Sequence, residues 1–234
     1  MRFTFLNTVK ISAVLLLSYT VVAGLLMPVP RLDILNETIR NLYFHVPMWF
    51  AQIAIFSVAL YHSLRYLRVQ GNPSYSLVQR QKIDLAAYSA VSVGMLFGVL
   101  GLLTGMMWAN FTWGAPWSSD VKLNCTAIGM LMYLAYFVLR ASFTDEEKQS
   151  RFAAIYNVFC YVLFVVLIFV IPRMKEFSVH PGNGGNPAFA KYDLDNYMRL
   201  VFYPAVIGWV CLSVWIWDIL RKYREIKLLS SLQD

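Results

Sequence analysis

Six apolar runs dominate the sequence and restrict the chain to folds that cross a lipid bilayer. Apolar residues make up 59% of the 234 residues and charged residues only 14%, a balance that is unusual for a water-soluble domain. Each run holds roughly 17 to 23 residues, enough for a helix to cross a hydrocarbon core about 30 Å thick. The runs are Ile11 to Met27, Val46 to Leu64, Leu85 to Met107, Leu123 to Leu139, Ala153 to Ile171 and Leu200 to Leu220.

The backbone in these runs is expected to be helical, because a chain in lipid must satisfy its own hydrogen bonds. The runs also lack the strict alternation of a membrane barrel. The sequence therefore predicts an all-α, polytopic membrane protein with one domain over residues 1–234. The first run resembles a signal peptide in its basic start and in Ala23–Gly24, but it is long and has no clear A-x-A site, so we expect a helix there.

Four glycines recur at every third or fourth position of the third run: Gly94, Gly98, Gly101 and Gly105. Small residues at this spacing let a neighbouring helix approach closely. We expect that neighbour to be another helix of the same chain, and the alternative is dimerisation through this face.

The basic residues predict the orientation in the membrane, since cytoplasmic connections carry an excess of Lys and Arg. With the N-terminus inside, thirteen lie on the inner side: Arg2, Lys10, Arg65, Arg68, Arg80, Lys82, Arg140, Lys148, Arg151, Arg221, Lys222, Arg224 and Lys227. Seven lie outside: Arg31, Arg40, Lys122, Arg173, Lys175, Lys191 and Arg199. Both termini are therefore expected in the cytoplasm, and the net charge of +7 gives no reason to expect a nucleic-acid partner.

This orientation puts three segments on the outer face: residues 28–45, 107–122 and 172–199. The first ends at His45 and contains Asn36–Glu37, which predict the start of a short surface helix. Pro47 suits the first turn of the next helix, so His45 is expected close to a helix start at the membrane boundary.

The second outer segment is rich in aromatic residues. Trp108, Phe111, Trp113 and Trp117 fall within ten residues, beside Gly114, Pro116, Asp120 and Lys122. A single Trp in such a place most often belongs to the interfacial aromatic belt. Three Trp in one short segment, next to a turn and an ion pair, favour a surface that holds a ligand.

The third outer segment holds His180, followed by a turn-rich stretch from Pro181 to Pro187. The chain has three histidines, and His62 lies at the inner end of its span, beside basic residues. His45 and His180 flank the tryptophan segment on the outer face. Two imidazoles beside an aromatic platform suit haem, because imidazole is a good axial ligand of iron and the porphyrin needs apolar contacts.

The same residues carry a family resemblance. The WGxxWxxD pattern of Trp113, Gly114, Trp117 and Asp120, with HVP at His45 and S-x-H at His180, resembles the haem-handling membrane proteins of cytochrome c biogenesis. The chain is most similar to the CcmC type, haem exporter protein C, in length and number of spans, since the CcmF and CcsA types are larger. The resemblance covers nearly the whole chain, with its specific part in the outer segments.

The resemblance implies a multi-pass protein of the bacterial inner membrane with its haem b site facing the periplasm. His45 and His180 match the two axial ligands, and the matching tryptophan-rich segment holds haem and meets a periplasmic haem chaperone. That segment comprises Trp108, Trp113, Gly114, Trp117 and Asp120. ABC-type export subunits are further partners that the family implies. The family often reads WGxxWxWD, whereas Ser118–Ser119 precede Asp120 here, so one aromatic wall is expected to be missing or supplied by Phe111 or Trp49.

The mechanism expected from these residues is to hold haem and hand it over, as a binding and transfer protein rather than an enzyme. Two imidazoles would hold the iron, the tryptophans would cover the porphyrin, and Lys122, Arg31 or Arg40 would pair with a propionate. The three cysteines form neither CxxC nor CxxCH, which argues against a thiol oxidoreductase or a c-type cytochrome.

Two other classes are alternatives. A membrane b-type electron carrier also needs paired imidazoles, but it places them within the spans, where this chain has no histidine at mid-depth. A non-haem transporter subunit with interfacial tryptophans would show ionisable residues along a pathway. The spans offer almost none apart from Asp84 and Asp218, both near the inner boundary.

Overall fold

The computed structural model describes residues 5–31, 35–174 and 194–233, and this part of the chain is helical without a strand. The long helices are α1 (Phe5–Leu26), α2 (Leu42–Val69), α3 (Leu77–Trp113), α4 (Val121–Ala141), α5 (Glu146–Val165) and α6 (Asn196–Ser230). Three short helices accompany them: η1 (Asn36–Asn41), η2 (Val166–Val170) and η3 (Ile171–Met174). The six long helices, α5 with its short extensions, are long and apolar enough to cross a membrane.

The lateral surface of the helix bundle, which runs along the sides of the helices, is apolar. Large side chains such as Leu103, Val138 and Phe159 are more than half exposed along the helices. Such a surface is unfavourable in water but suits contact with lipid tails. The chain is therefore a multi-pass membrane protein, as the sequence predicted, and the all-α prediction is confirmed.

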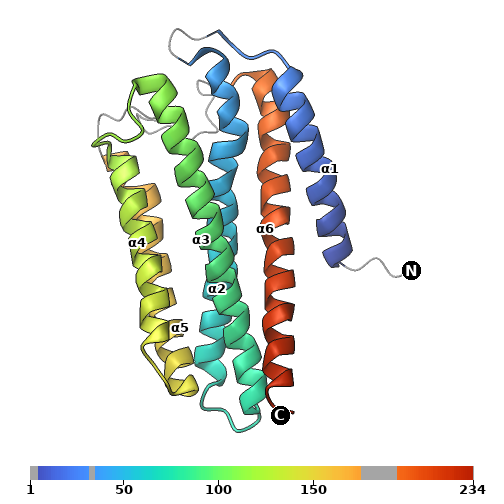
Figure 1. The fold of residues 1–234 in the computed structure, drawn as a ribbon, viewed down its shortest axis with the longest axis vertical. Coiled ribbons are helices and arrows are strands. Elements are labelled where there is room, and N and C mark those ends of the chain that lie inside the picture. Colours follow the sequence, from blue (N-terminus) through green and yellow to red (C-terminus); the bar gives the residue numbers. More distant parts are fainter. Residues whose placement is uncertain (1–4, 32–34, 175–193, 234) are drawn as a thin grey trace.

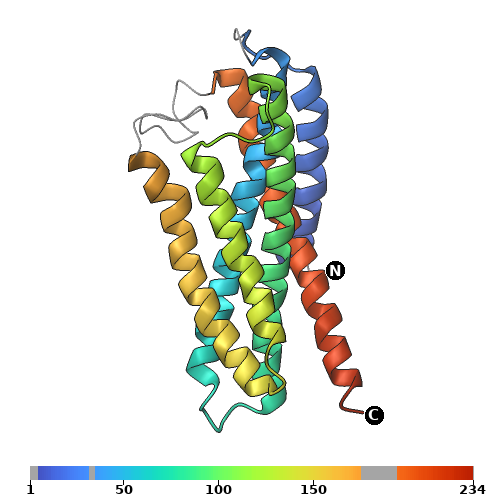
Figure 2. The same ribbon diagram turned by 60° about the vertical axis from the view of Figure 1, so that its left-hand side comes forward.

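The helices alternate in direction, and α2 and α3 lie in the middle of the bundle (Figure 1). Helices α4 and α5 flank them on one side, and α6 with α1 on the other (Figures 1 and 2). Helix α1 packs along α6, and Arg40 fixes its end by donating from Nη1 to the carbonyl oxygens of Gly24 and Met27, at 2.8 and 2.7 Å. The first apolar run is thus an integral helix of the bundle.

The glycine face of α3 packs against α2 within the chain, as expected from the sequence. A Cβ atom added at Gly101 would lie 2.8 Å from the Trp49 ring, and one added at Gly105 would lie 2.6 Å from His45 Cε1. Gly94 and Gly98 likewise face side chains of α2. The small residues therefore bring the two helices close together along their length.

Two helix boundaries near the predicted site differ from the expectation. Helix α2 begins at Leu42, directly after the 3₁₀ helix η1, so Pro47 lies in its second turn rather than its first. Helix α3 continues to Trp113, so Trp108, Phe111 and Trp113 lie in its last turns and the connection to α4 is confined to residues 114–120. Polar and aromatic residues thus extend both helices beyond their apolar runs.

Candidate functional site

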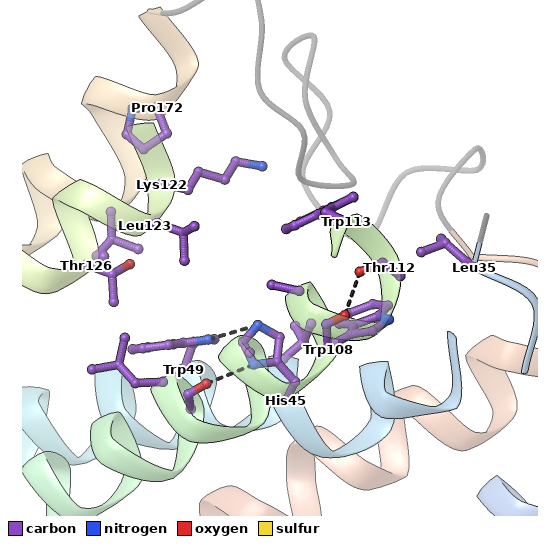
Figure 3. Close-up of a pocket in the computed structure, with 16 residues that line it drawn as sticks. Leu35, His45, Trp49, Trp108, Thr112, Trp113, Lys122, Leu123, Thr126 and Pro172 are labelled. Carbon is purple, nitrogen blue, oxygen red and sulfur yellow. Dashed lines mark hydrogen bonds between the residues drawn. The ribbon is translucent and has the colours of Figure 1, made fainter. Parts of the chain in front are cut away.

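A cavity opens where the second half of α3 meets the start of α2, at the end of the bundle that holds the α3–α4 connection (Figure 3). Its volume is about 220 Å³, far more than the roughly 30 Å³ that one water occupies in the liquid. Side chains from α2, α3, α4 and the end of the α5 segment line it, and most of them are apolar or aromatic. A mainly apolar cavity with few polar groups is typical of sites for organic ligands.

His45 is the main polar group in this cavity, and its ring is oriented by α3. Its Nδ1 lies 3.0 Å from the carbonyl oxygen of Gly101 and 3.2 Å from Thr104 Oγ1. A carbonyl oxygen only accepts hydrogen bonds. The Thr104 hydroxyl donates its proton to the Leu100 carbonyl oxygen at 2.8 Å, so toward His45 it also acts as an acceptor. We therefore assign the proton of the neutral ring to Nδ1, which leaves the lone pair on Nε2.

The Nε2 atom of His45 faces Trp49. The indole Nε1 of Trp49 donates to it over 3.5 Å, a long and therefore weak hydrogen bond (Figure 3). The ring of His45 also meets the rings of Trp49 and Trp108 edge to face, with centroids 6.0 Å apart in both pairs. Metal-binding imidazoles typically donate their other N–H to a carbonyl or carboxylate, and the contact of His45 Nδ1 with the Gly101 carbonyl oxygen has this arrangement.

Trp108 is held in place by η1, because its Nε1 donates to Thr38 Oγ1 at 3.2 Å. Trp113 and Lys122 line the cavity from the end of α3 and the first turn of α4, and both point toward its open side in Figure 3. The cavity thus combines an imidazole, indole rings and a cation.

The wall opposite α3 comes from an irregular part of the fifth span. Ile168 and Pro172 line the cavity there, and Ile168 belongs to the π-helical turn η2. A proline ring clashes with the carbonyl group four residues earlier in a regular α-helix, and for Pro172 that carbonyl belongs to Ile168. The wider π turn, in which Ile171 donates to the Val166 carbonyl oxygen, accommodates the proline.

The remaining residues of the WGxxWxxD pattern shape the connection rather than line the cavity. Gly114 ends α3 in a left-handed conformation with φ +77°, and its N–H bonds to the Asn110 carbonyl oxygen at 3.1 Å. Asp120 caps α4 by accepting from the Lys122 N–H at 2.8 Å. Trp117 lies between them, 38% exposed and away from the cavity lining.

Among the three basic residues predicted to meet a propionate, only Lys122 lines the cavity. Arg40 is bound to the end of α1 and to Glu37, with Nε 2.6 Å from the carboxylate. Arg31 is exposed and does not line the cavity.

The two aromatic residues expected as substitutes for the missing wall, Trp49 and Phe111, lie in different places. Trp49 lines the cavity, whereas Phe111 is 73% exposed on the outside of α3. His180, the second predicted ligand, lies outside the described residues. His62 lies in a different cavity, at the other end of the bundle.

Sequence reasoning missed Thr104 and the Gly101 carbonyl as partners of His45. One signal was present: His45 and Trp49 are four residues apart, which puts them on one helix face, and the glycines of α3 mark the face that receives them. Which carbonyl meets the ring depends on the packing of α2 against α3, which spacing does not reveal.

The site can contribute one imidazole nitrogen to a metal. Among the described residues, no group of three His, Cys, Asp or Glu side chains gathers as a metal site. A cavity with one imidazole, an aromatic lining and a cation suits a metal that an apolar macrocycle already holds, better than a bare ion. Fold and cavity together define a polytopic membrane protein with an imidazole-bearing aromatic site at one end.

Comparison with known proteins gives the family. Residues 1–178 match the family described as cytochrome C assembly protein, and the chain belongs to that family. It is similar to heme exporter protein C of Haemophilus influenzae, 26% identical over 190 residues, which cover 81% of this chain and 71% of the relative.

Two further relatives match over shorter stretches. Heme exporter protein C of Bradyrhizobium diazoefficiens is 31% identical over 121 residues, 51% of this chain and 42% of the relative. Cytochrome c biogenesis protein CcsA of Prochlorococcus marinus (strain MIT 9515) is 35% identical over 97 residues, 42% of this chain and 30% of the relative. The chain thus spans less than half the length of these two relatives.

Proposed function

We propose that this protein holds haem b in the cavity beside His45 and hands it to a haem chaperone during the maturation of c-type cytochromes. The membership in the cytochrome C assembly family and the names of the relatives support haem as the cargo. The observation that carries the proposal is the hydrogen bond of His45 Nδ1 to the Gly101 carbonyl, 3.0 Å long, because it leaves the metal-binding lone pair on Nε2.

In this proposal each group of the cavity has one task. His45 Nε2 ligates the iron, and His180, predicted from the sequence, supplies the second axial nitrogen. The indole rings of Trp49, Trp108 and Trp113 cover the porphyrin and exclude water. Lys122 pairs with a propionate.

The connection between α3 and α4 is the proposed docking surface for the chaperone. Trp117, in this connection, exposes 38% of its surface, and Phe111, in the adjoining last turn of α3, exposes 73%. Exposed aromatic residues are common anchors at protein interfaces. ABC-type export subunits are proposed as further partners in the membrane.

A haem content measurement tests the ligands. The protein is expressed with ample haem and purified in detergent, and bound haem per chain is measured by absorption. We expect His45→Ala and His180→Ala to lose most of the haem, and His62→Ala, at the other end of the bundle, to retain it. An unchanged Soret band in the double variant His45→Ala/His180→Ala would overturn the ligand assignment.

A maturation assay tests the transfer. The protein is expressed in a bacterium that lacks its own haem exporter protein C, and covalent haem in c-type cytochromes is stained after denaturing electrophoresis. We expect Trp113→Ala/Trp117→Ala to reduce staining strongly and the matched control Phe137→Ala, a half-buried aromatic residue on α4 far from the connection, to leave it normal. Normal staining with both tryptophans replaced would refute the role of the connection.

The orientation is also part of the proposal: the cavity faces the periplasm of the bacterial inner membrane. In a variant with its three cysteines replaced by serine, Ser119→Cys, at an exposed position of the α3–α4 connection, should react with a membrane-impermeant maleimide in intact spheroplasts. Ser74→Cys, in the α2–α3 connection, should react only after lysis. The reverse pattern would contradict the orientation.

The number of histidines limits the electron-carrier alternative. A carrier that moves electrons across the bilayer through two bis-histidine haems needs four histidines, and the chain has three. Haem transfer to an acceptor, rather than reversible reduction in place, therefore agrees better with this sequence.

A further inference from the structure

A second cavity lies at the opposite end of the bundle, between the end of α2, the start of α3 and the second half of α6. Its volume is about 340 Å³. The charged side chains that line it are Arg65, Lys82, Arg221 and Glu225. None of the residues assigned to the His45 cavity takes part in it, so the proposed function leaves this site unexplained.

The lining of this cavity carries an excess of positive charge. Arg221 is neutralised locally, because its Nη1 lies 2.6 Å from Glu225 and its Nη2 lies 3.0 Å from Asp218. Asp218 also binds Lys222, at 2.6 Å. Within the described part of the chain, Arg65 and Lys82 make no ion pair and no side-chain hydrogen bond, so their two charges are available to an anion.

His62 also lines the cavity, and its Nδ1 atom is buried. The ring of His62 is fixed beside Trp217, with centroids 5.7 Å apart.

The position of the cavity matches the depth of lipid headgroups. Arg65 lies four residues before the end of α2, and Lys82 lies five residues after the start of α3, so both lie within two turns of the end of a membrane-crossing helix. Tyr75 and Trp217 add aromatic surface, and Trp217 is anchored by the hydrogen bond from its Nε1 to the Ala86 carbonyl oxygen at 3.0 Å. Tyr and Trp are enriched at this level of the bilayer.

We propose that this cavity binds the phosphate group of an anionic phospholipid headgroup. Arg65 and Lys82 bind the phosphate oxygens, and Tyr75 with Trp217 contacts the start of the acyl chains. Basic pockets between membrane helices recognise headgroups in this way. A free phosphate ion offers the same charge without acyl chains, so the two sources can be separated.

Binding of short-chain lipids in detergent tests the proposal. Delipidated protein is titrated with dihexanoyl phosphatidylglycerol, with dihexanoyl phosphatidylcholine and with inorganic phosphate by isothermal titration calorimetry. We expect phosphatidylglycerol to bind at least about tenfold more tightly than the other two. Equal binding of the two lipids would overturn the proposal. Phosphate binding as tight as phosphatidylglycerol binding would assign the site to a free anion instead.

Matched variants locate the site. Arg65→Gln/Lys82→Gln should weaken phosphatidylglycerol binding roughly tenfold or more, since each basic residue near an anionic headgroup contributes about 1 kcal/mol. Arg68→Gln/Lys227→Gln removes the same charge at the same end but outside the cavity, and should change binding less than about twofold. Equal losses in both pairs would overturn the site. Helix content by circular dichroism and bound haem verify that the first pair is folded, and they distinguish this test from a failure of the haem site.

Discussion

The hydrogen bond from His45 Nδ1 to the Gly101 carbonyl oxygen decides which ring nitrogen can serve a metal. A backbone carbonyl cannot change its role with pH or rotate like a side chain, so it is a stable partner for the Nδ1–H. The competing partner of Nε2, the Trp49 indole, is weak at 3.5 Å. The proposed ligand is therefore oriented without bound haem.

Trp49 gives a prediction at this scale. Its indole N–H must release His45 Nε2 when iron binds, while its ring remains as a cavity wall. We expect Trp49→Phe to bind haem at least as tightly as the wild type, because only the competing donor is lost. Trp49→Ala should bind roughly 2- to 10-fold more weakly, since an aromatic contact contributes about 0.5–1.5 kcal/mol.

Haem titration followed by absorption measures both affinities, and Phe111→Ala, on the exposed side of α3, is the control that should bind normally. Weaker binding by Trp49→Phe than by Trp49→Ala would contradict this role of the indole.

His45, Trp108, Trp113 and Lys122 line one cavity, and the sequence pointed to them because their residue types are chemically distinctive. The Gly101 carbonyl could not, since a backbone group leaves no mark in the sequence. Gly114, Trp117 and Asp120 were predicted as site residues, whereas the described structure has Gly114 and Asp120 forming the helix ends on either side of the connection.

At the scale of the element, the glycine face of α3 sets the distance to α2 and thereby the position of His45. A Cβ atom at Gly105 would lie 2.6 Å from His45 Cε1 and 3.1 Å from Nδ1. Neither contact can be relieved without moving the imidazole or separating the helices.

We therefore expect Gly105→Ala to lower haem affinity by about 10- to 100-fold, the range typical of changes around a ligating histidine. Gly71→Ala is the matched control, because a Cβ atom there meets nothing within 4 Å. Haem titration of both variants provides the measurement. Wild-type affinity in Gly105→Ala would show that the packing of α3 does not position the ligand.

Asp120 is the N-cap residue of α4. Asp120→Ala should lower the free energy of unfolding by about 0.5–2 kcal/mol, since the side chain no longer caps α4. Asp120→Asn should remain within about 0.5 kcal/mol of the wild type, because Asn caps as well as Asp. Denaturant unfolding in detergent, followed by circular dichroism, compares the two. Equal losses in both variants would indicate that the charge matters rather than the cap.

The helix ends were the least predictable part of the fold. Hydropathy predicted six spans because each apolar run is long, but it ended the third span at Met107 and began the second at Val46. The structure extends α3 to Trp113 and starts α2 at Leu42. Helix α3 ends where Gly114 caps it, and α2 begins where η1 ends. Neither feature changes the hydropathy of the sequence, so hydropathy could not predict these two helix ends.

At the scale of the whole molecule, the two ends of the bundle differ in chemistry. One end holds the aromatic cavity of His45, and the other holds the basic cavity of Arg65 and Lys82. Between α3 and α4, near the basic end, Arg140 and Asp84 form a buried pair with two hydrogen bonds, one of them 2.9 Å long. The sequence assigned Arg140 to a connection, whereas it lies buried in the last turn of α4.

This pair gives a prediction about the stability of the bundle. Asp84→Asn should destabilise the protein by about 3–5 kcal/mol, because it leaves the Arg140 charge buried without its partner. Asp84→Leu/Arg140→Met should recover most of that loss, since it removes both charges. Unfolding in mixed detergent micelles compares the variants. A double variant less stable than Asp84→Asn would contradict the argument.

The central claim is that His45 Nε2 ligates haem iron, and imidazole rescue of a cavity variant tests it most directly. His45→Gly leaves space for a free imidazole at the position of the lost side chain. We expect the absorption spectrum of its haem complex to lose the low-spin form of the wild type and to regain it when millimolar imidazole is added, while His62→Gly keeps the wild-type spectrum without imidazole. A His45→Gly spectrum identical to that of the wild type before imidazole is added would contradict the claim.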